Sequence, residues 1–451
     1  MNFDALPLDP LLAQAAKACG YETLTQVQAK VIPTALAGRD LMACAQTGTG
    51  KTAAFSFVLL QRLLNQPRAI GQLSALILTP TRELAIQVAD SISRYSQFTE
   101  LTTLAVYGGA NINPQRKALA RGVDILVATP GRLFDLLGQH DLSLETVDQL
   151  IVDEADRMLD MGFVRDIERT KRLLCVSHST MLFSATFTPE VKALATKMLD
   201  NPEWINVTSA SSGPQIEQKI YPLDARRKAE LLAELIGRNN WQQVLVFVNT
   251  KESAERLHRE LKLDGIKNAV FHGDKTQGAR NRALEQFKAG ELRVLVATDV
   301  AARGLDITAL PLVINLELPD EPQDYVHRIG RTGRAGLSGV SISFVAKQDE
   351  TALGAIEALI GKTLPREVQP GYEMGAPLPA RYRELDTRVT SKAAQPKRGK
   401  GQKFGSQDGR RGQSRAKAPQ RKAPQRKTSS DKASNDKARR PSSDKGFRGK
   451  R

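Results

Sequence analysis

The sequence predicts an α/β fold of two parallel sheets, each flanked by helices, on three observations. Short apolar runs alternate with stretches of helical periodicity along most of the 451 residues, which is typical of βαβ units. The alternation occurs in two series that resemble each other. Only the first series carries a glycine-rich loop between an apolar run and a helical stretch, at residues 45–52. We therefore expect two related domains of different chemistry.

The strands are expected where the apolar runs lie. A helical pattern from Phe3 to Gly38 precedes the first run. In a parallel sheet the loops at the carboxyl ends of the strands carry function, so candidate site residues are sought there. The runs are residues 41–45, 74–80, 103–109, 124–130, 149–153 and 181–186 in the first series, and 243–250, 268–273, 293–299, 312–318 and 339–346 in the second.

Short matches between the two series indicate a duplication. Leu126-Val127-Ala128-Thr129 recurs as Leu295-Val296-Ala297-Thr298, 169 residues later, and Thr81-Arg82-Glu83 is echoed at the same offset by Thr250-Lys251-Glu252. The matching segments occur in the same order in both series and are separated by nearly the same number of residues, which favours duplicated domains over chance. A nucleotide is then expected between the copies, held by the first and completed by the second.

Composition sets the boundaries. The polar stretch 208–215 predicts a linker, which separates a domain at 31–207 from a domain at 216–375. An N-terminal segment is expected at 1–30. Residues 376–451 are predicted to be a disordered basic tail, because from Ser391 on Pro, Gly, Ser, Gln, Lys and Arg predominate and cannot form a core. Residues 391–451 hold 21 Lys and Arg against 4 Asp and Glu, while residues 1–390 hold 44 against 45. The net charge of +16 therefore belongs to the tail.

Several classes of protein are disfavoured. The three cysteines show no C-x-x-C spacing, which argues for a reducing compartment and against a zinc site. The first residues lack the pattern of a signal peptide, and no apolar run reaches the roughly 18 residues of a membrane span. A cytoplasmic protein without membrane contact is expected.

The loop Ala45-Gln46-Thr47-Gly48-Thr49-Gly50-Lys51-Thr52 is typical of a phosphate-binding loop. Glycines let backbone N–H groups converge on an anion, and the following helix N-terminus adds positive partial charge. Lys51 is then expected at the β- and γ-phosphates and Thr52 at Mg²⁺. The general pattern has Gly where this chain has Ala45, so a simple Gly/Thr-rich turn stays open as the alternative.

Charged residues follow other strands. Asp153 and Glu154 come after an apolar run; Asp153 suits Mg²⁺ coordination, and Glu154 is placed to deprotonate a water that attacks the γ-phosphate. An acidic cluster alone is usually a solvated helix start. In the second series Arg331 and Arg334 lie on a glycine-rich turn and are candidates for arginine fingers.

With these motifs the chain resembles the DEAD-box ATP-dependent RNA helicases, and among them the bacterial RhlE-like branch, over roughly residues 1–375. Leu24 departs from the family, which usually has Pro there. The matching segments are Phe3, Gln28, the loop 45–52, Pro80-Thr81-Arg82-Glu83-Leu84, Gly108-Gly109, Thr129-Pro130-Gly131-Arg132, Asp153-Glu154-Ala155-Asp156, Ser184-Ala185-Thr186, Phe247, Gln277 with Arg280, Thr298-Asp299, Arg303-Gly304-Leu305-Asp306 and 327–334.

The resemblance implies two tandem RecA-like domains, ATP and Mg²⁺ as cofactors, and a role for each matching residue. ATP is expected at Phe3, Gln28, all of 45–52, Gly304 and Asp306, with Lys51, Asp153, Glu154, Arg331 and Arg334 catalytic. Coupling between ATP and RNA is expected from Ser184, Thr186, His327 and Arg328. RNA is expected at Arg82, Gly109, Thr129, Arg132, Gln277, Arg280 and Thr298.

The function implied is RNA-stimulated ATP hydrolysis that closes the two domains on RNA and separates short duplexes. Contacts to sugar and phosphate leave bases unread, so binding should be independent of sequence. A monomer acting in ribosome assembly or RNA metabolism is expected, with ribosomal or RNA-processing proteins as partners. Two alternatives are a non-catalytic ATP-gated RNA-binding scaffold, which a complete hydrolytic set argues against, and a DNA-directed translocase.

Overall fold

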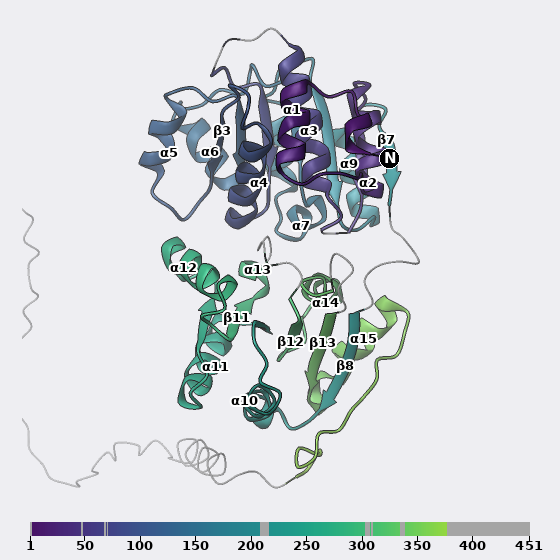
Figure 1. Cartoon of the computed structure of the whole chain (residues 1–451), viewed down its shortest axis with the longest axis vertical. Coiled ribbons are helices and arrows are strands. Elements are labelled where there is room, and N and C mark those ends of the chain that lie inside the picture. The colour runs from purple at the N-terminus through teal and green to yellow at the C-terminus, as the bar shows by residue number, and fades with distance from the viewer. Residues whose placement is uncertain are drawn as a thin grey trace, which may run out of the picture. The chain divides into compact units, whose positions relative to one another are not determined.

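The structure, a computed structural model, describes residues 2–46, 48–66, 69, 71–207, 216–302, 307, 310–333 and 339–376. The predicted linker at 208–215 and the tail from residue 377 lie outside this part of the chain. The described residues contain two all-parallel sheets with helices packed against them (Figure 1). None of their helices has the length and apolar character needed to cross a membrane.

The first sheet has seven strands in the order β3-β4-β2-β5-β6-β1-β7. Strands β5, β6 and β1 are therefore neighbours although they come from distant parts of the sequence, and β1 pairs with β6 from Leu41 beside Met181 to Cys44 beside Ser184. The strands are β1 (Leu41–Cys44), β2 (Ala75–Leu78), β3 (Thr103–Val106), β4 (Ile125–Ala128), β5 (Gln149–Val152), β6 (Ser179–Ser184) and β7 (Glu203–Asn206).

Helices cover both faces of this sheet, because successive strand residues point to opposite sides. Leu41 and Ala43 belong to one buried cluster with the helices α1 to α4, whereas Met42 belongs to another with α6 to α9. The helical elements are η1 (Phe3–Ala5), α1 (Pro10–Ala18), α2 (Gln26–Leu36), α3 (Lys51–Asn65), α4 (Arg82–Tyr95), α5 (Ile112–Leu119), α6 (Pro130–Gly138), α7 (Ala155–Asp160), α8 (Val164–Lys171) and α9 (Pro189–Met198).

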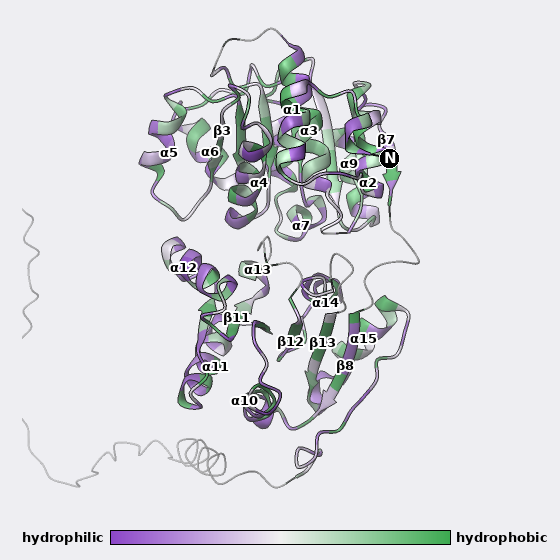
Figure 2. Ribbon diagram, viewed as in Figure 1, coloured by the Kyte–Doolittle hydropathy of each residue, from purple (hydrophilic) through white to green (hydrophobic). Residues whose placement is uncertain are grey.

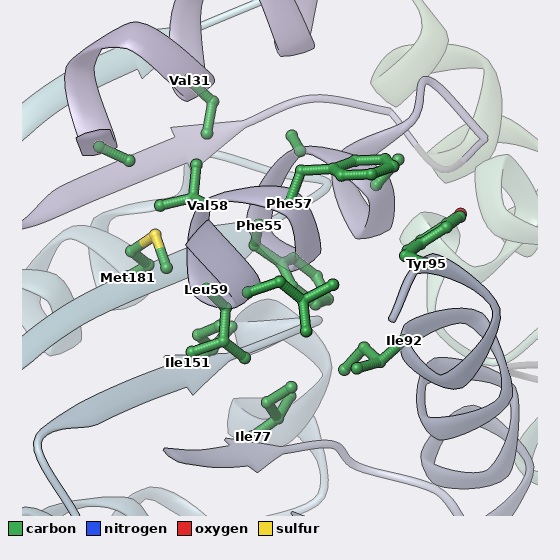
Figure 3. Packing of buried hydrophobic residues seen from close by; sticks show 14 of the residues in the cluster. Val31, Phe55, Phe57, Val58, Leu59, Ile77, Ile92, Tyr95, Ile151 and Met181 are labelled. Carbon is green, nitrogen blue, oxygen red and sulfur yellow. The ribbon is translucent and has the colours of Figure 1, made fainter. Parts of the chain in front are cut away.

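Helix α3 is the centre of the first cluster. Phe55, Val58 and Leu59 are fully buried, and they pack with Ile77 and Met181 of the sheet (Figure 3). A helix buried on nearly all sides is held by packing, not by its own propensity. Because α3 begins at Lys51, this packing fixes the place where the glycine-rich loop ends.

The second sheet has six strands in the order β10-β11-β9-β12-β13-β8. Its strands are β8 (Ile216–Pro222), β9 (Val244–Val248), β10 (Asn268–Phe271), β11 (Val294–Thr298), β12 (Leu312–Asn315) and β13 (Gly339–Val345). Its helical elements are η2 (Ala225–Arg227), α10 (Lys228–Arg238), α11 (Lys251–Leu263), α12 (Gln277–Lys288), α13 (Asp299–Ala302), α14 (Pro322–Ile329), η3 (Lys347–Asp349) and α15 (Glu350–Ile360). The outer helices α11 and α12 carry broad hydrophilic faces (Figure 2).

The predicted duplication is confirmed by the strand order. Numbered from its own first strand, each sheet reads 3-4-2-5-6-1, and β7 is an additional edge strand of the first sheet. The offset of 169 residues also joins equivalent strands, since β2 begins at Ala75 and β9 at Val244. Strand β8 is therefore the counterpart of β1, but the chain after it has no glycine-rich loop.

Every predicted run overlaps a strand, although β6 begins at Ser179, two residues before its run; β7 and β8 were not predicted. Both lie at sheet edges, and both mix exposed with buried residues, as in Trp204 beside the buried Ile205. An edge strand is covered on fewer sides, so it needs no continuous apolar run. The pattern that located the other strands is absent from these two.

Candidate functional site

The glycine-rich loop lies between β1 and α3 and depends on two left-handed glycines. Gly48 and Gly50 have φ values of 81° and 95°, which side-chain-bearing residues rarely adopt. At Gly50 an added Cβ atom would also lie 2.6 Å from the side-chain Nε2 of Gln28. Position 50 therefore requires glycine for both backbone and space. Thr47 lies outside the described residues.

The ammonium of Lys51 is buried at the end of this loop. Only 7% of the residue is exposed, and Nζ donates to the carbonyl oxygens of Ala45 and, at 3.3 Å, Ser184. No ion pair involves Lys51 within the described segments. A buried cation whose hydrogen bonds go only to backbone carbonyls favours the arrival of an anion, as expected where phosphates bind.

Two carboxylates lie at the same edge of the sheet, directly after β5. Asp153 is buried, and its pKa is raised to about 7 by desolvation and the nearby Glu154, although Lys51 acts to lower it. Glu154 has a φ of 52°. Its Oε2 is buried, lies 3.6 Å from the Arg157 guanidinium and has no hydrogen-bond partner in the described part of the chain. Strain of this kind in a non-glycine residue often marks a functional position.

The donor set fits Mg²⁺. A threonine hydroxyl and a carboxylate are oxygen ligands of the type that this hard cation prefers, and Thr52 and Asp153 supply them beside the buried ammonium. A divalent cation here would also offset the cost of ionising Asp153, whose burial otherwise favours the neutral acid.

Asp156 connects the acidic motif with the loop after β6. Its Oδ2 accepts hydrogen bonds from the amides of Ala185 and Thr186, each at 3.0 Å, and from the Thr186 hydroxyl at 3.1 Å. Although burial acts to raise it, the pKa of Asp156 is lowered, because His327, Lys51 and the hydroxyls of Ser184 and Thr186 favour the charged form. Sequence reasoning placed Asp156 in the motif but gave it no role.

The N-terminal residues expected at the adenine are closely packed. Gln28 is 1% exposed; its Oε1 accepts from the Thr25 amide at 2.9 Å and its Nε2 donates to the Gly50 carbonyl at 3.4 Å. Phe3 is 2% exposed, with its ring 5.0 Å from that of Phe57 and 5.2 Å from that of Tyr21. Gln28 thus contacts the loop, whereas Phe3 belongs to an aromatic cluster of the core.

The RNA candidates of the first domain gather at the ends of β2, β3 and β4. Arg82 begins α4 beside Gly109, where an added Cβ would overlap its guanidinium. Thr129 accepts a hydrogen bond from the Gly108 amide, and the buried Arg132 donates to the Ala110 carbonyl at 2.9 Å. The structure therefore brings together all four residues that were predicted to bind RNA here.

The RNA candidates of the second domain lie at the start of α12 and the end of β11. Gln277 is the first residue of α12, and its Oε1 accepts from the Arg280 guanidinium. Arg280 is 2% exposed and forms an ion pair of 2.8 Å with Glu83 of the first domain. Thr298 ends β11, the neighbour of β10.

Helix α14 and the turn after it carry the remaining candidates. Arg328, 1% exposed, donates to both carboxylate oxygens of Asp299 and to the Asn249 amide oxygen, so its guanidinium holds the second domain together. Burial and the nearby Arg157 lower the pKa of His327. Arg331 is also buried, at 6% exposure. The predicted residues Gly304, Asp306 and Arg334, with Arg303 and Leu305 of the same motif, lie outside the described residues.

Comparison with known proteins agrees with these motifs. Residues 25–194 match the DEAD/DEAH box helicase family, and residues 227–336 match the helicase conserved C-terminal domain. The chain is 42% identical over 383 residues to an ATP-dependent RNA helicase RhlB of Pseudomonas syringae pv. tomato, which covers 83% of this chain and 96% of the relative. It is 39% identical over 371 residues to a DEAD-box ATP-dependent RNA helicase CshA of Bacillus licheniformis, and that alignment covers 82% of this chain and 76% of the relative.

A solved structure shows the same fold with ligands bound. S. cerevisiae Dbp5 bound to RNA and ADP BeF3 superposes with a TM-score of 0.75 at 30% identity. The alignment covers 86% of this chain and 99% of the yeast chain.

The substitution Asp156→Asn should loosen the loop after β6. Asparagine has one acceptor oxygen, so it cannot accept both from Ala185 and Thr186 and from the Arg157 amide, which donates to Oδ1 of Asp156 at 3.0 Å. We therefore expect a loss of about 2 to 4 kcal/mol of unfolding free energy at neutral pH. Because the folded pKa of Asp156 is below its ordinary value of about 3.9, this difference should shrink only as pH falls through the folded pKa. Urea unfolding at about pH 7 and at steps down toward about pH 3 measures the stability difference, and hydrogen exchange at Ala185 and Thr186 reports on the loop itself.

The exposed Asp90 on α4 is the control for that substitution. Asp90→Asn should change neither the free energy of unfolding nor the hydrogen exchange at Ala185 and Thr186. Equal exchange at Ala185 and Thr186 in Asp156→Asn and the unaltered chain would contradict the assignment.

The substitution Gly109→Ala should displace the Arg82 guanidinium. A left-handed φ costs alanine about 1 to 2 kcal/mol, and the new methyl group would overlap that guanidinium. Gly162→Ala is the matched control, since Gly162 has a similar φ of 78° but open space around its Cβ position. Nucleic-acid affinity should fall in Gly109→Ala alone, while both variants lose similar stability; equal affinity in the two would count against a role for Arg82.

Proposed function

The chain belongs to the DEAD-box family of ATP-dependent RNA helicases, and on that premise we propose which of its residues bind ATP, cleave it and hold RNA. The family uses ATP with Mg²⁺ and couples its hydrolysis to RNA unwinding. The observation that carries the proposal is the meeting of Lys51, Asp153 and Glu154 at one edge of the first sheet, next to the loop at Gly48 and Gly50.

Phosphate binding is assigned to the loop and to Lys51. On ATP binding the ammonium exchanges the carbonyl of Ser184 for phosphate oxygens, so an interaction between a cation and a dipole becomes one between opposite charges. Thr52 and Asp153 hold Mg²⁺, which when bound neutralises charge on the phosphates. Gln28 contacts adenine and donates a hydrogen bond to the Gly50 carbonyl, so it connects the adenine site with the loop. Phe3 packs in the core next to this region and supports the adenine site.

Glu154 is the proposed general base. Its Oε2 has no hydrogen bond to any residue that the structure describes and is therefore available to orient the attacking water and accept its proton. The buried Arg157 lies 3.6 Å away and places a positive charge beside the carboxylate. Arg331 and Arg334 are proposed to stabilise the charge that develops on the γ-phosphate.

Coupling is assigned to the contacts between motifs. Asp156 fixes Thr186 and the loop after Ser184, and His327 lies close enough to Asp156 to influence its pKa. Arg328 is not proposed to contact ATP or RNA, because its guanidinium is bound to Asp299 and Asn249 within the second domain. It positions α14, and with it His327.

RNA is proposed to lie along the two candidate clusters, Arg82, Gly109, Thr129 and Arg132 in the first domain and Gln277, Arg280 and Thr298 in the second. Side chains of these types contact phosphate and sugar, which gives binding without sequence selection. Closure of the domains on ATP and RNA then separates short duplexes locally. We propose a cytoplasmic monomer that acts in ribosome assembly or RNA metabolism with protein partners of those processes.

The finer branch stays a prediction. The sequence resemblance pointed to the RhlE-like branch, whereas the relatives above carry the names RhlB and CshA. The non-catalytic scaffold and the DNA-directed translocase stay as the alternatives that experiment must exclude.

The substitution Glu154→Gln should abolish ATP hydrolysis and preserve ATP-dependent RNA binding. The amide keeps the shape of the site but cannot accept a proton, so we expect a fall in kcat of at least about 10²-fold. RNA-stimulated ATPase and RNA binding with and without ATP are the measurements. Glu145→Gln, at an exposed residue outside the site, should behave as the unaltered chain.

Near-normal hydrolysis by Glu154→Gln would remove Glu154 as the base. An unaltered chain without ATPase activity would favour the scaffold, and equal stimulation by single-stranded DNA and RNA of one sequence would favour the DNA-directed alternative.

Deletion of residues 391–451 should weaken RNA capture without slowing the chemistry. Residues 1–390 have a net charge of −1, so most long-range attraction comes from the tail of +17. If about 5 basic residues engage phosphates, the slope of log K against log salt should flatten by roughly 3 to 4, since each phosphate on a single strand contributes about 0.7. RNA titrations of the ATPase at several salt concentrations measure both quantities.

Maximal ATPase at saturating RNA should survive this deletion. An unchanged salt slope and half-saturating RNA concentration would mean that the tail serves solubility or a protein partner. A collapsed maximal rate would place the tail in the catalytic unit.

A further inference from the structure

The turn between β10 and α12 leads directly to the proposed RNA contacts of the second domain. After Phe271 the chain passes through residues 272–275 to Thr276, whose hydroxyl accepts from the Ala279 amide at 3.3 Å and caps α12. Gln277 is the next residue. The position of this turn therefore decides where the first residues of α12 lie.

One carboxylate on the neighbouring helix α11 holds both ends of the turn. Glu255 Oε1 lies 3.0 Å from His272 Nε2 and 2.6 Å from Lys275 Nζ. The pKa of Glu255 is lowered chiefly by the Lys275 hydrogen bond and then by His272, so the carboxylate is ionised at neutral pH. Lys251, also on α11, pairs with Asp274 of the same turn at 2.6 Å.

His272 depends on this contact. The residue is 4% exposed, and its Nδ1 is buried with no hydrogen-bond partner among the residues that the structure describes. The only side-chain hydrogen bond found for the ring in those segments is therefore the one to Glu255. Loss of that acceptor would leave both ring nitrogens of a buried imidazole unsatisfied.

We propose that Glu255 is a positioning residue for RNA binding: through His272 and Lys275 it fixes the turn that presents Gln277 and Arg280 to the RNA backbone. This inference rests on the proposed function, since it assumes that those two residues contact RNA. Glu255 itself touches no RNA in this scheme.

The sign of the effect separates positioning from simple electrostatics. RNA is a polyanion, so removal of an acidic residue near its site should strengthen binding if charge alone mattered. Positioning predicts the opposite, because a displaced turn carries Gln277 and Arg280 away from the phosphates. Glu252, at the start of the same helix and exposed, offers the same change of charge without a contact to the turn.

The test titrates the RNA-stimulated ATPase of the full chain with a short single-stranded RNA. Glu255→Ala should raise the half-saturating RNA concentration by about 5- to 20-fold, as expected for loss of a charge-assisted hydrogen-bond network. Glu255→Gln, which keeps an acceptor oxygen, should lie between Glu255→Ala and the unaltered chain. Glu252→Ala should leave the value unchanged or lower it, and the half-saturating ATP concentration should be unaltered in all three.

Gln277→Ala in the same assay tests the premise separately. If Gln277→Ala binds RNA normally, the proposed contact at α12 is wrong and the inference falls with it. If Gln277→Ala is impaired but Glu255→Ala is not, the RNA site stands and the positioning role is overturned. Tighter RNA binding by Glu255→Ala, or an equal loss of ATP affinity, would also overturn it.

A second variant guards against a folding defect in Glu255→Ala. In a double-mutant cycle with Lys275→Met, two changes that act through one contact should cost no more together than the larger does alone. Fully additive effects on the half-saturating RNA concentration would show that Glu255 and Lys275 act separately, against the inference.

Discussion

The buried contact of the Lys51 ammonium with the carbonyls of Ala45 and Ser184 is the interaction on which the site depends. It joins the ends of β1 and β6, and the strand order places β5, with Asp153 and Glu154, directly alongside. A buried cation is costly in the protein interior, even with the carboxylates of Asp153 and Asp156 near enough to interact with it. The fold bears that cost through the packing of α3, and the result is a site that already favours phosphate before a nucleotide arrives.

Duplication explains how two similar sheets came to carry different chemistry. Both have the strand order 3-4-2-5-6-1, so each offers the same edge for functional loops. In the first copy that edge carries the glycine-rich loop after β1, which is proposed to bind phosphate. In the second copy the buried Arg328 and the half-buried Asp299 form an ion pair at that edge and position α14. In the proposed assignment, one copy binds the nucleotide and the other supplies Arg331 and Arg334.

The sequence was sufficient wherever the position of a residue follows from the strand that precedes it. Continuous apolar runs located the interior strands and the edge strands β3 and β10, and the carboxyl ends of such runs located Lys51, Asp153 and Arg82. It failed for β7 and β8, whose edge positions need no such run. It also assigned no role to Asp156 or Glu255, because their partners, Thr186 and His272, are brought to them by sheet order and helix packing. The close packing of Phe3 was equally invisible, since burial depends on Phe57 and Tyr21 from other elements.

The two unpredicted edge strands have a consequence for how far the domains can separate. Strand β7 ends at Asn206 and β8 begins at Ile216, so the chain between them can span at most roughly 30 to 35 Å even if fully extended. A tether this short keeps the local concentration of one domain around the other in about the millimolar range. A few contacts such as the pair of Glu83 and Arg280 are then enough to bias closure, and a larger interface, which would oppose release after each cycle, is not needed.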